Sequence, residues 1–212
     1  MFIPGLPTGV SRRSQSWRAT VASQAGSFPV GTAHLLVEFT LPPGRWVDLD
    51  TILMTTVAGL RDAGVYRRGL SRLESVVATK AVGAEVGVWL GPAATLGASE
   101  PPGPLLLRVE APRPPAPELS AKRAWRARVQ AAWGERPPLG GSVWAAVTLT
   151  GQGSLLGRLE VVLDALEPVL GRDLRGRDWQ EFFPADDRID WLRVRRSEQG
   201  PGLLLQLGPV EV

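Results

Sequence analysis

The sequence contains no cysteine and only one histidine, His34, among its 212 residues. Without cysteine the chain can form neither a disulfide framework nor a metal site built on thiolates. His34 lies inside an apolar pattern typical of a strand, and this setting favours a packed side chain over a catalytic one. The composition therefore excludes the common cysteine-dependent classes and gives no sign of histidine chemistry.

Long apolar runs are also missing. No run reaches the roughly 18 residues that a membrane span requires. The first residues, MFIPGLPTGVSRR, lack the basic region and the long apolar stretch of a signal peptide. We therefore expect a cytoplasmic protein with no membrane partner. A hydrophobic fraction of 44% is ample for a core, and 212 residues suffice for one large domain or two small ones.

Lysine is scarce. Of the 24 basic residues, only Lys80 and Lys122 are lysines, and the other 22 are arginines. With 21 acidic residues the formal net charge is only +3. An arginine-rich surface suits phosphate binding, since the planar guanidinium group can grip two phosphate oxygens at once. The same composition is also typical of a GC-rich genome or of heat resistance. The charge alone does not separate these explanations.

Residue patterns in the first half predict a mixture of strands and helices. Strands are expected at residues 2–6, 33–41, 73–81 and 84–90, and helices at 14–25 and 51–63. The last two strands should pair as a hairpin around Gly83. The Gly-, Ala- and Pro-rich stretch 91–104 has no periodicity and is typical of a linker.

The pattern of the first half then recurs in the second half. Residues 16–41 align without a gap on residues 124–149, with eight identities at a constant offset of 108. A helical pattern at 155–170 and strand patterns at 189–196 and 202–207 follow in the same order. A tandem duplication explains this agreement better than chance does.

We therefore predict an α/β protein of the α+β type, built from two tandem β-α-β-α-β-β units. The first copy should span residues 1–92 and the second 103–212, with a linker at 93–102. A duplicated fold commonly replaces a homodimer, so we expect a monomer that acts as an internal pseudo-dimer about a pseudo-two-fold axis. Trp17 and Trp125 should then occupy equivalent, partly buried helix positions.

Two carboxylates, Asp48 and Asp50, lie between the second predicted strand and the second predicted helix. If both stand at the exit of the strand, they point the same way, because side chains alternate across a strand. Such a pair can share Mg2+, which takes oxygen ligands and keeps several waters. In the alternative, Asp50 is the N-cap of a helix that begins at Thr51, a position where Asp is favoured.

The element order, the D-x-D at the second helix and the final pair of strands resemble the RusA family of Holliday junction resolvases. Members of that family are homodimeric, Mg2+-dependent endonucleases that cut four-way DNA junctions. In the first copy, Asp48 and Asp50 match the D-x-D of the family, and Lys80 matches a basic residue at a strand end. Met54 stands where the family has a Lys, and Arg67-Arg68 where it has an acidic pair.

The second copy carries the complementary half of the family pattern. Asp186 and Asp187 match the acidic pair, whereas Ser154 and Leu156 occupy the D-x-D positions. The resemblance implies either a composite catalytic site, in which Asp48 and Asp50 meet Asp186 or Asp187, or a degenerate protein that binds DNA without cutting it. The complementary loss favours the composite site, because random decay would not preferentially leave one full set. The family's acidic residues lie close together in sequence and should cluster within one subunit, and on this ground we expect the degenerate protein.

The resemblance also implies a cofactor and a partner. Mg2+, held by Asp48 and Asp50, is the expected cofactor if the chain is an active endodeoxyribonuclease, and branched or duplex DNA is the expected partner in recombination or repair. The residues expected to contact DNA are Arg67, Arg68, Lys80, Arg193, Arg195 and Arg196. Arg193 and Arg195 alternate onto one face of a strand. The alternative function is a scaffold or assembly protein that retains only the fold.

Overall fold

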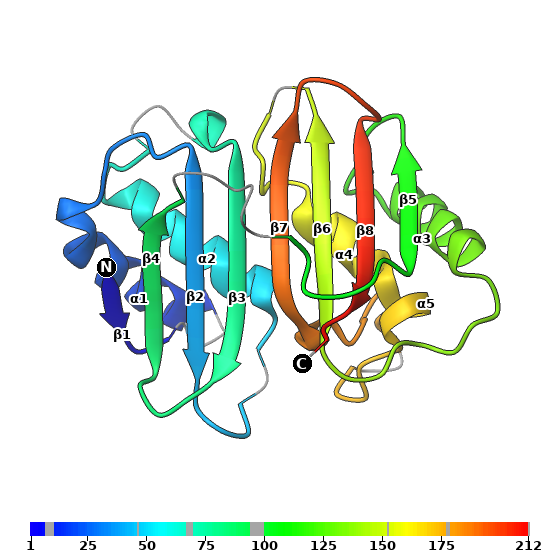
Figure 1. Cartoon of the computed structure of the whole chain (residues 1–212), viewed down its shortest axis with the longest axis horizontal. Coiled ribbons are helices and arrows are strands. Elements are labelled where there is room, and N and C mark those ends of the chain that lie inside the picture. Colours follow the sequence, from blue (N-terminus) through cyan, green and yellow to red (C-terminus); the bar gives the residue numbers. More distant parts are fainter. Residues whose placement is uncertain are drawn as a thin grey trace. The chain divides into compact units, whose positions relative to one another are not determined.

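A computed structural model describes residues 1–6, 11–45, 47–66, 70–93, 100–151, 153–176 and 179–211. The chain forms two compact units. The first comprises Met1–Glu100 with Trp191–Arg193, and the second comprises Pro101–Asp190 with Val194–Val212. Both units are mixed α+β structures (Figure 1). Most of the predicted linker, residues 94–99, lies outside the described residues.

Four strands and two helices make up the first unit. The strands are β1 (Phe2–Pro4), β2 (His34–Leu41), β3 (Ser75–Val82) and β4 (Gly87–Pro92), in the order β1-β4-β2-β3. Strands β2 and β3 are parallel, whereas β4 is antiparallel to both β1 and β2. Helix α1 (Ser11–Gln24) precedes β2, and α2 (Leu49–Asp62) provides the crossover that a parallel pair requires.

The second unit repeats this plan. Its strands are β5 (Leu107–Ala111), β6 (Val143–Thr150), β7 (Ile189–Ser197, without the three residues assigned above to the first unit) and β8 (Leu203–Pro209). Their order is β5-β8-β6-β7, and β8 is antiparallel to both β5 and β6. Helix α3 (Leu119–Trp133) precedes β6, and α4 (Leu159–Leu163) and α5 (Glu167–Leu170) follow it. Each strand of the first unit therefore has a counterpart at the same place in the second.

The predicted hairpin of residues 73–81 and 84–90 is wrong. Strand β4 pairs with β2 and not with β3, so β2 lies between the two strands that follow each other in sequence. The connection crosses the end of β2, where the Gly83 N–H donates to the Leu41 carbonyl at 3.0 Å. A glycine between two apolar runs signals a turn, but it does not specify which strand lies next to which.

The helix predicted at 155–170 is interrupted. A 3-10 turn over Asp164–Leu166 separates α4 from α5. Pro168 lies in the first turn of α5 and has no N–H to donate to the Asp164 carbonyl, so a regular helix cannot continue through this point. None of the helices in the described ranges is both long and apolar enough to cross a membrane.

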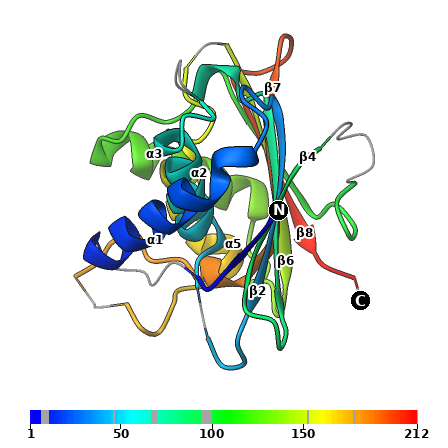
Figure 2. The same ribbon diagram turned by 90° about the vertical axis from the view of Figure 1, so that its left-hand side faces the viewer.

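In each unit the helices lie on one face of the strands (Figure 2). Trp17 and Trp125 lie at corresponding places on α1 and α3 and are only 5% and 4% exposed, so both are more deeply buried than predicted. The Trp17 indole N–H donates to the Thr56 hydroxyl at 3.0 Å, and that of Trp125 to the Val162 carbonyl at 3.1 Å. Each tryptophan thus connects the first helix of its unit to the second.

Helices α1 and α2 approach closely at Gly59. A Cβ atom there would lie 2.6 Å from the Cβ of the fully buried Val21 and 3.1 Å from the backbone carbonyl oxygen of Arg18. We expect Gly59→Ala to lower the free energy of unfolding by about 1–3 kcal/mol, because overpacking outweighs the higher helix propensity of Ala. Denaturant unfolding measures this change.

Gly26→Ala is the control, because a Cβ at Gly26 meets nothing within 4 Å. The combination Val21→Gly/Gly59→Ala should lose less stability than the sum of its two single changes, since Val21→Gly removes the Cβ that the new methyl group would meet. Equal changes in unfolding free energy for Gly59→Ala and Gly26→Ala would show that α1 and α2 are not tightly packed at Gly59.

Candidate functional site

The carboxyl-terminal ends of β2 and β3 meet at one edge of the first unit, where Leu41 lies opposite Val82. Ligand sites in open α/β sheets commonly lie at the carboxyl ends of parallel strands. Asp48 and Asp50 follow β2, and Lys80 lies near the end of β3. The topology therefore brings the D-x-D and the basic residue of the family pattern to the same edge.

Neither prediction for the local geometry of the D-x-D is correct. Strand β2 ends at Leu41, so Asp48 and Asp50 do not share the face of a strand. Asp48, not Asp50, occupies the N-cap position of α2, and its side chain makes no capping hydrogen bond among the described residues. The helix begins at Leu49, two residues before the predicted start, because the buried Leu49 is part of its packed face.

Asp50 is a buried carboxylate in the first turn of α2, with 6% of the residue exposed. Its Oδ1 accepts a hydrogen bond from the Thr51 N–H at 2.7 Å. The partial positive charge at a helix N-terminus stabilises a negative side chain there. Asp48 is partly buried beside it. Both side chains carry oxygens of the kind that Mg2+ binds.

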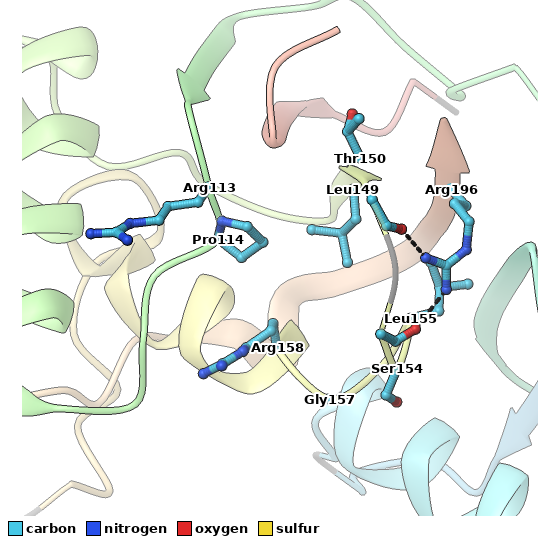
Figure 3. Close-up of a pocket in the computed structure, with 11 residues that line it drawn as sticks. Arg113, Pro114, Leu149, Thr150, Ser154, Leu155, Gly157, Arg158 and Arg196 are labelled. Atoms are coloured by element: carbon cyan, nitrogen blue, oxygen red, sulfur yellow. Dashed lines mark hydrogen bonds between the residues drawn. The ribbon is translucent and has the colours of Figure 1, made fainter. Parts of the chain in front are cut away.

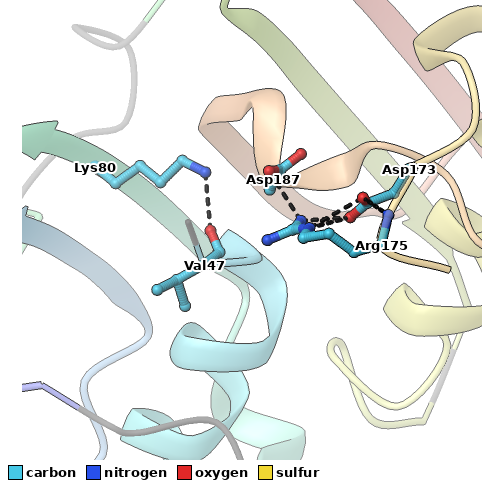
Figure 4. Close-up of polar contacts among 5 residues, drawn as sticks. All are labelled: Val47, Lys80, Asp173, Arg175 and Asp187. Carbon is cyan, nitrogen blue, oxygen red and sulfur yellow. Dashed lines mark hydrogen bonds and ion pairs between the residues drawn. The ribbon is translucent and has the colours of Figure 1, made fainter. Parts of the chain in front are cut away.

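Lys80 is held next to the D-x-D segment. Its Nζ donates to the Val47 carbonyl at 2.9 Å, immediately before Asp48 in the chain (Figure 4). The contact joins residues 33 positions apart in sequence. An ammonium group at this position lowers the electrostatic cost of keeping two carboxylates together at the edge.

The acidic pair of the second copy lies in a different setting. Asp186 and Asp187 begin a 3-10 turn, Asp186–Arg188, directly before β7. The Asp187 carboxylate pairs with Arg175 Nη2 at 2.9 Å (Figure 4). Arg175 also binds Asp173, with Nε at 2.7 Å from Oδ2, and holds the pKa of Asp173 below its usual value by donating to the carboxylate. A metal ion at Asp187 would therefore compete with a guanidinium group.

The second unit separates the two halves of the family pattern. Asp186 and Asp187 precede β7, whereas Ser154 and Leu156 follow β6. Strands β6 and β7 run in the same direction in Figure 1, so these segments lie at opposite edges of this unit. Within the described part of either unit, no three His, Asp or Glu side chains form a group that could hold a metal ion. The composite site stays a prediction.

The arginines predicted to contact DNA have different surroundings. Arg67 and Arg68 lie outside the described residues. Arg193 and Arg195 share one face of β7, opposite the buried Leu192 and Val194. The Arg193 guanidinium lies 5.6 Å from the centre of the Trp191 ring, and Arg195 Nε donates to the Thr148 hydroxyl at 3.1 Å. Arg195 is the exposed member of the pair.

Arg196 holds a loop. Its Nη2 donates to the Gly153 carbonyl at 2.7 Å, and its Nη1 donates to the Gly151 carbonyl. The loop connects β6 to α4 and borders a cavity of about 540 Å³ (Figure 3). Sequence reasoning missed Arg113 and Arg158, which line this cavity. The sequence signal that could have indicated this site is the group Gly151, Gly153 and Gly157 between a strand and a helix. Glycines at such a place are typical of phosphate-binding loops.

His34 is less packed than predicted. It lies on β2 opposite Ser75, with Nδ1 2.6 Å from the Ser75 hydroxyl oxygen and Nε2 3.8 Å from a Glu74 carboxylate oxygen. The side chain is 40% exposed, whereas Ser75 is buried. A buried hydroxyl cannot reach a substrate, so this cluster stabilises the start of two strands and offers no nucleophile.

No model of a known protein family matches the sequence, and no curated protein matches it. The resemblance to the RusA family therefore depends on the short sequence motifs alone and stays a prediction. In chemical terms, the first unit offers two carboxylates and an ammonium group at one edge. The second unit offers arginines and a glycine-containing loop at the corresponding edge.

Proposed function

We propose that the chain is a tandem RusA-like protein that binds branched DNA, such as a Holliday junction, in recombination or repair, and does not cut it. The observation that carries this proposal is the grouping of Asp48, Asp50 and Lys80 at the carboxyl edge of β2 and β3. The shared strand order of the two units supports a duplication. In this proposal the units are related by a pseudo-two-fold axis and replace the two subunits of a homodimer.

Binding without cutting follows from the distribution of the carboxylates. Phosphodiester hydrolysis of this type needs carboxylates that hold Mg2+, which activates water and neutralises charge in the transition state. The first unit supplies Asp48 and Asp50, and the second has Ser154 and Leu156 in their place. Asp187 of the second unit is paired with Arg175. In an active version of the protein, Asp48 and Asp50 would hold the ion together with Asp186 or Asp187.

A second candidate function is favoured by the ion pairs on the surface. Arg18 pairs with Asp62, Arg108 with Glu110, and Arg123 with Glu181, each at 2.6 Å. Arginines neutralised in this way attract phosphate less than isolated ones do. They suit a scaffold or assembly protein that retains only the fold.

The dependence of DNA affinity on salt tests the first function against the second. Phosphate contacts release counterions, so the logarithm of the association constant should fall linearly with the logarithm of salt concentration, by about 0.9 for each phosphate neutralised on duplex DNA. Arg195→Gln should weaken binding to duplexes of any sequence. It should also make the slope shallower by about 0.9, the contribution of one phosphate contact. Fluorescence anisotropy with a labelled duplex measures both quantities.

Arg123→Gln is the matched control, because it removes the same charge from an arginine already paired with Glu181. It should leave the slope unchanged. If the wild-type protein does not bind DNA at low salt, or if its affinity does not respond to salt, the scaffold function replaces the DNA-binding one.

A further inference from the structure

The cavity beside the loop after β6 is strongly basic. Three of its eleven lining residues are arginines, namely Arg113, Arg158 and Arg196, and none is acidic (Figure 3). An adjoining cavity of about 640 Å³ shares Arg113 and Arg158 and adds Arg128, again without an acidic lining residue. Four arginines thus line two neighbouring cavities in a chain whose basic and acidic residues are nearly equal in number.

Arg113 and Arg158 differ from the other exposed arginines of this unit. Neither forms a hydrogen bond or ion pair with any residue that the structure describes, whereas Arg108 and Arg123 are each paired with a glutamate. Arg113 follows β5, and Arg158 directly precedes α4. In Figure 3 both side chains extend away from the loop that Arg196 holds. Two guanidinium groups from distant segments of the chain therefore border both cavities without a partner among the described residues.

The loop after β6 adds backbone donors. Gly151 and Gly153 have φ angles of +95° and +127°, a conformation that favours glycine, and a Cβ at either would meet nothing within 4 Å. Arg196 binds the carbonyls of both glycines. Because C=O and N–H point in opposite directions in a trans peptide, the Ser154 N–H points away from Arg196. A glycine-containing loop beside arginines is an arrangement found at anion sites.

We propose that this cavity is a phosphate-binding site. Arg113 and Arg158 bind the phosphate oxygens, and Arg196 is a positioning residue that fixes the loop. The phosphate belongs either to a nucleic-acid backbone or to a free nucleotide. The site follows β6 just as Asp48 and Asp50 follow β2, so corresponding edges carry carboxylates in the first unit and arginines in the second. The second unit thus binds phosphate directly, where the first would need a cation.

The test uses the full-length chain and inorganic pyrophosphate as the probe, measured by isothermal titration calorimetry at constant ionic strength. The variant Arg113→Gln/Arg158→Gln should weaken pyrophosphate binding by about tenfold for each guanidinium removed, a factor that corresponds to about 1.4 kcal/mol. Both side chains are exposed, so the variant should keep the thermal unfolding midpoint of the wild type. Arg158→Glu should abolish binding.

The control is Arg108→Gln/Arg123→Gln, which removes the same two charges from the same unit outside the two cavities. It should retain wild-type affinity for pyrophosphate. Absence of pyrophosphate binding by the wild type, or equal losses in both double variants, would overturn the proposal.

A second titration identifies the source of the phosphate. If Arg113→Gln/Arg158→Gln also weakens binding to a labelled DNA duplex, the site binds the nucleic-acid backbone. If it weakens binding of pyrophosphate and dATP but not of the duplex, the ligand is a free nucleotide. Pyrophosphate binding by a wild-type protein that does not bind DNA would contradict the proposed DNA-binding function and leave the phosphate site intact.

Discussion

Replacing Arg175 with Gln should lower the free energy of unfolding by about 3 kcal/mol at pH 7, at the lower end of the range for breaking a buried ion pair. The side chains of Asp173 and Asp187 are only 10% and 11% exposed, and Arg175 is the cation that both contact. Without it, two largely buried carboxylates lose their shared partner. The half-exposed Arg175 side chain keeps the loss from being larger.

The same substitution should change the dependence of stability on pH. Arg175 holds the pKa of Asp173 below its usual value, so the pair stabilises the fold at pH values above the unfolded pKa of about 3.9. This contribution is lost as the pH falls through the lower pKa of the folded state. The difference in unfolding free energy between wild type and Arg175→Gln should therefore shrink below about pH 4. Urea unfolding between pH 3 and 7 measures it.

Arg123→Gln is the matched control for this experiment. Arg123 also binds one carboxylate through two nitrogens, but its pair with Glu181 is exposed. Exposed pairs contribute little to stability because water screens them, so this variant should lose far less stability than Arg175→Gln does. Equal losses of unfolding free energy for both variants would show that burial of the Asp173 and Asp187 carboxylates does not strengthen their pairing with Arg175.

Removing either helix-connecting tryptophan should be still more destabilising. Trp17→Ala and Trp125→Ala should each cost about 3–5 kcal/mol, because each removes a large buried side chain and leaves a cavity. Each also removes a hydrogen bond to the second helix of its unit. The exposed Trp179 provides the control, and Trp179→Ala should change stability by less than about 0.5 kcal/mol.

The comparison of the two tryptophan variants also tests the correspondence between the units. If Trp17 and Trp125 occupy equivalent positions, the two variants should lose similar amounts of unfolding free energy. Agreement within about a factor of two is expected, because the cost of such a cavity depends on its surroundings. Thermal and denaturant unfolding give the values. A large loss for one variant and none for the other would show that the units do not share this packing.

The sequence predicted most elements of the fold but not how the strands are arranged. Periodicity located both helices of the first unit and the strands, since it reflects which side chains are buried. It could not show that β4 pairs with β2, because adjacency in a sheet depends on contacts between distant residues. The interruption at Pro168 was visible in the sequence, yet the apolar periodicity on both sides of it suggested one helix.

The sequence predicted which residues form the candidate site, but not how they are arranged. Asp48, Asp50 and Lys80 do lie at one edge, but the D-x-D lies at the start of α2 because packing of Leu49 extends the helix backward. The pairing of Asp187 with Arg175 depends on a loop whose course no local pattern determines. Arg113 and Arg158 were missed because they come from segments 45 residues apart and carry no periodic signal.

Binding of branched DNA without cleavage can be tested in one experiment. A labelled four-way junction and a duplex of the same sequence can be titrated with the wild-type protein and with Asp48→Asn, with Mg2+ and with chelator, and binding and cleavage read from the same samples. We expect both proteins to bind the junction more tightly than the duplex, and the DNA to stay intact at every Mg2+ concentration. Absence of junction binding, or Mg2+-dependent cleavage by the wild type that Asp48→Asn abolishes, would contradict the proposed function.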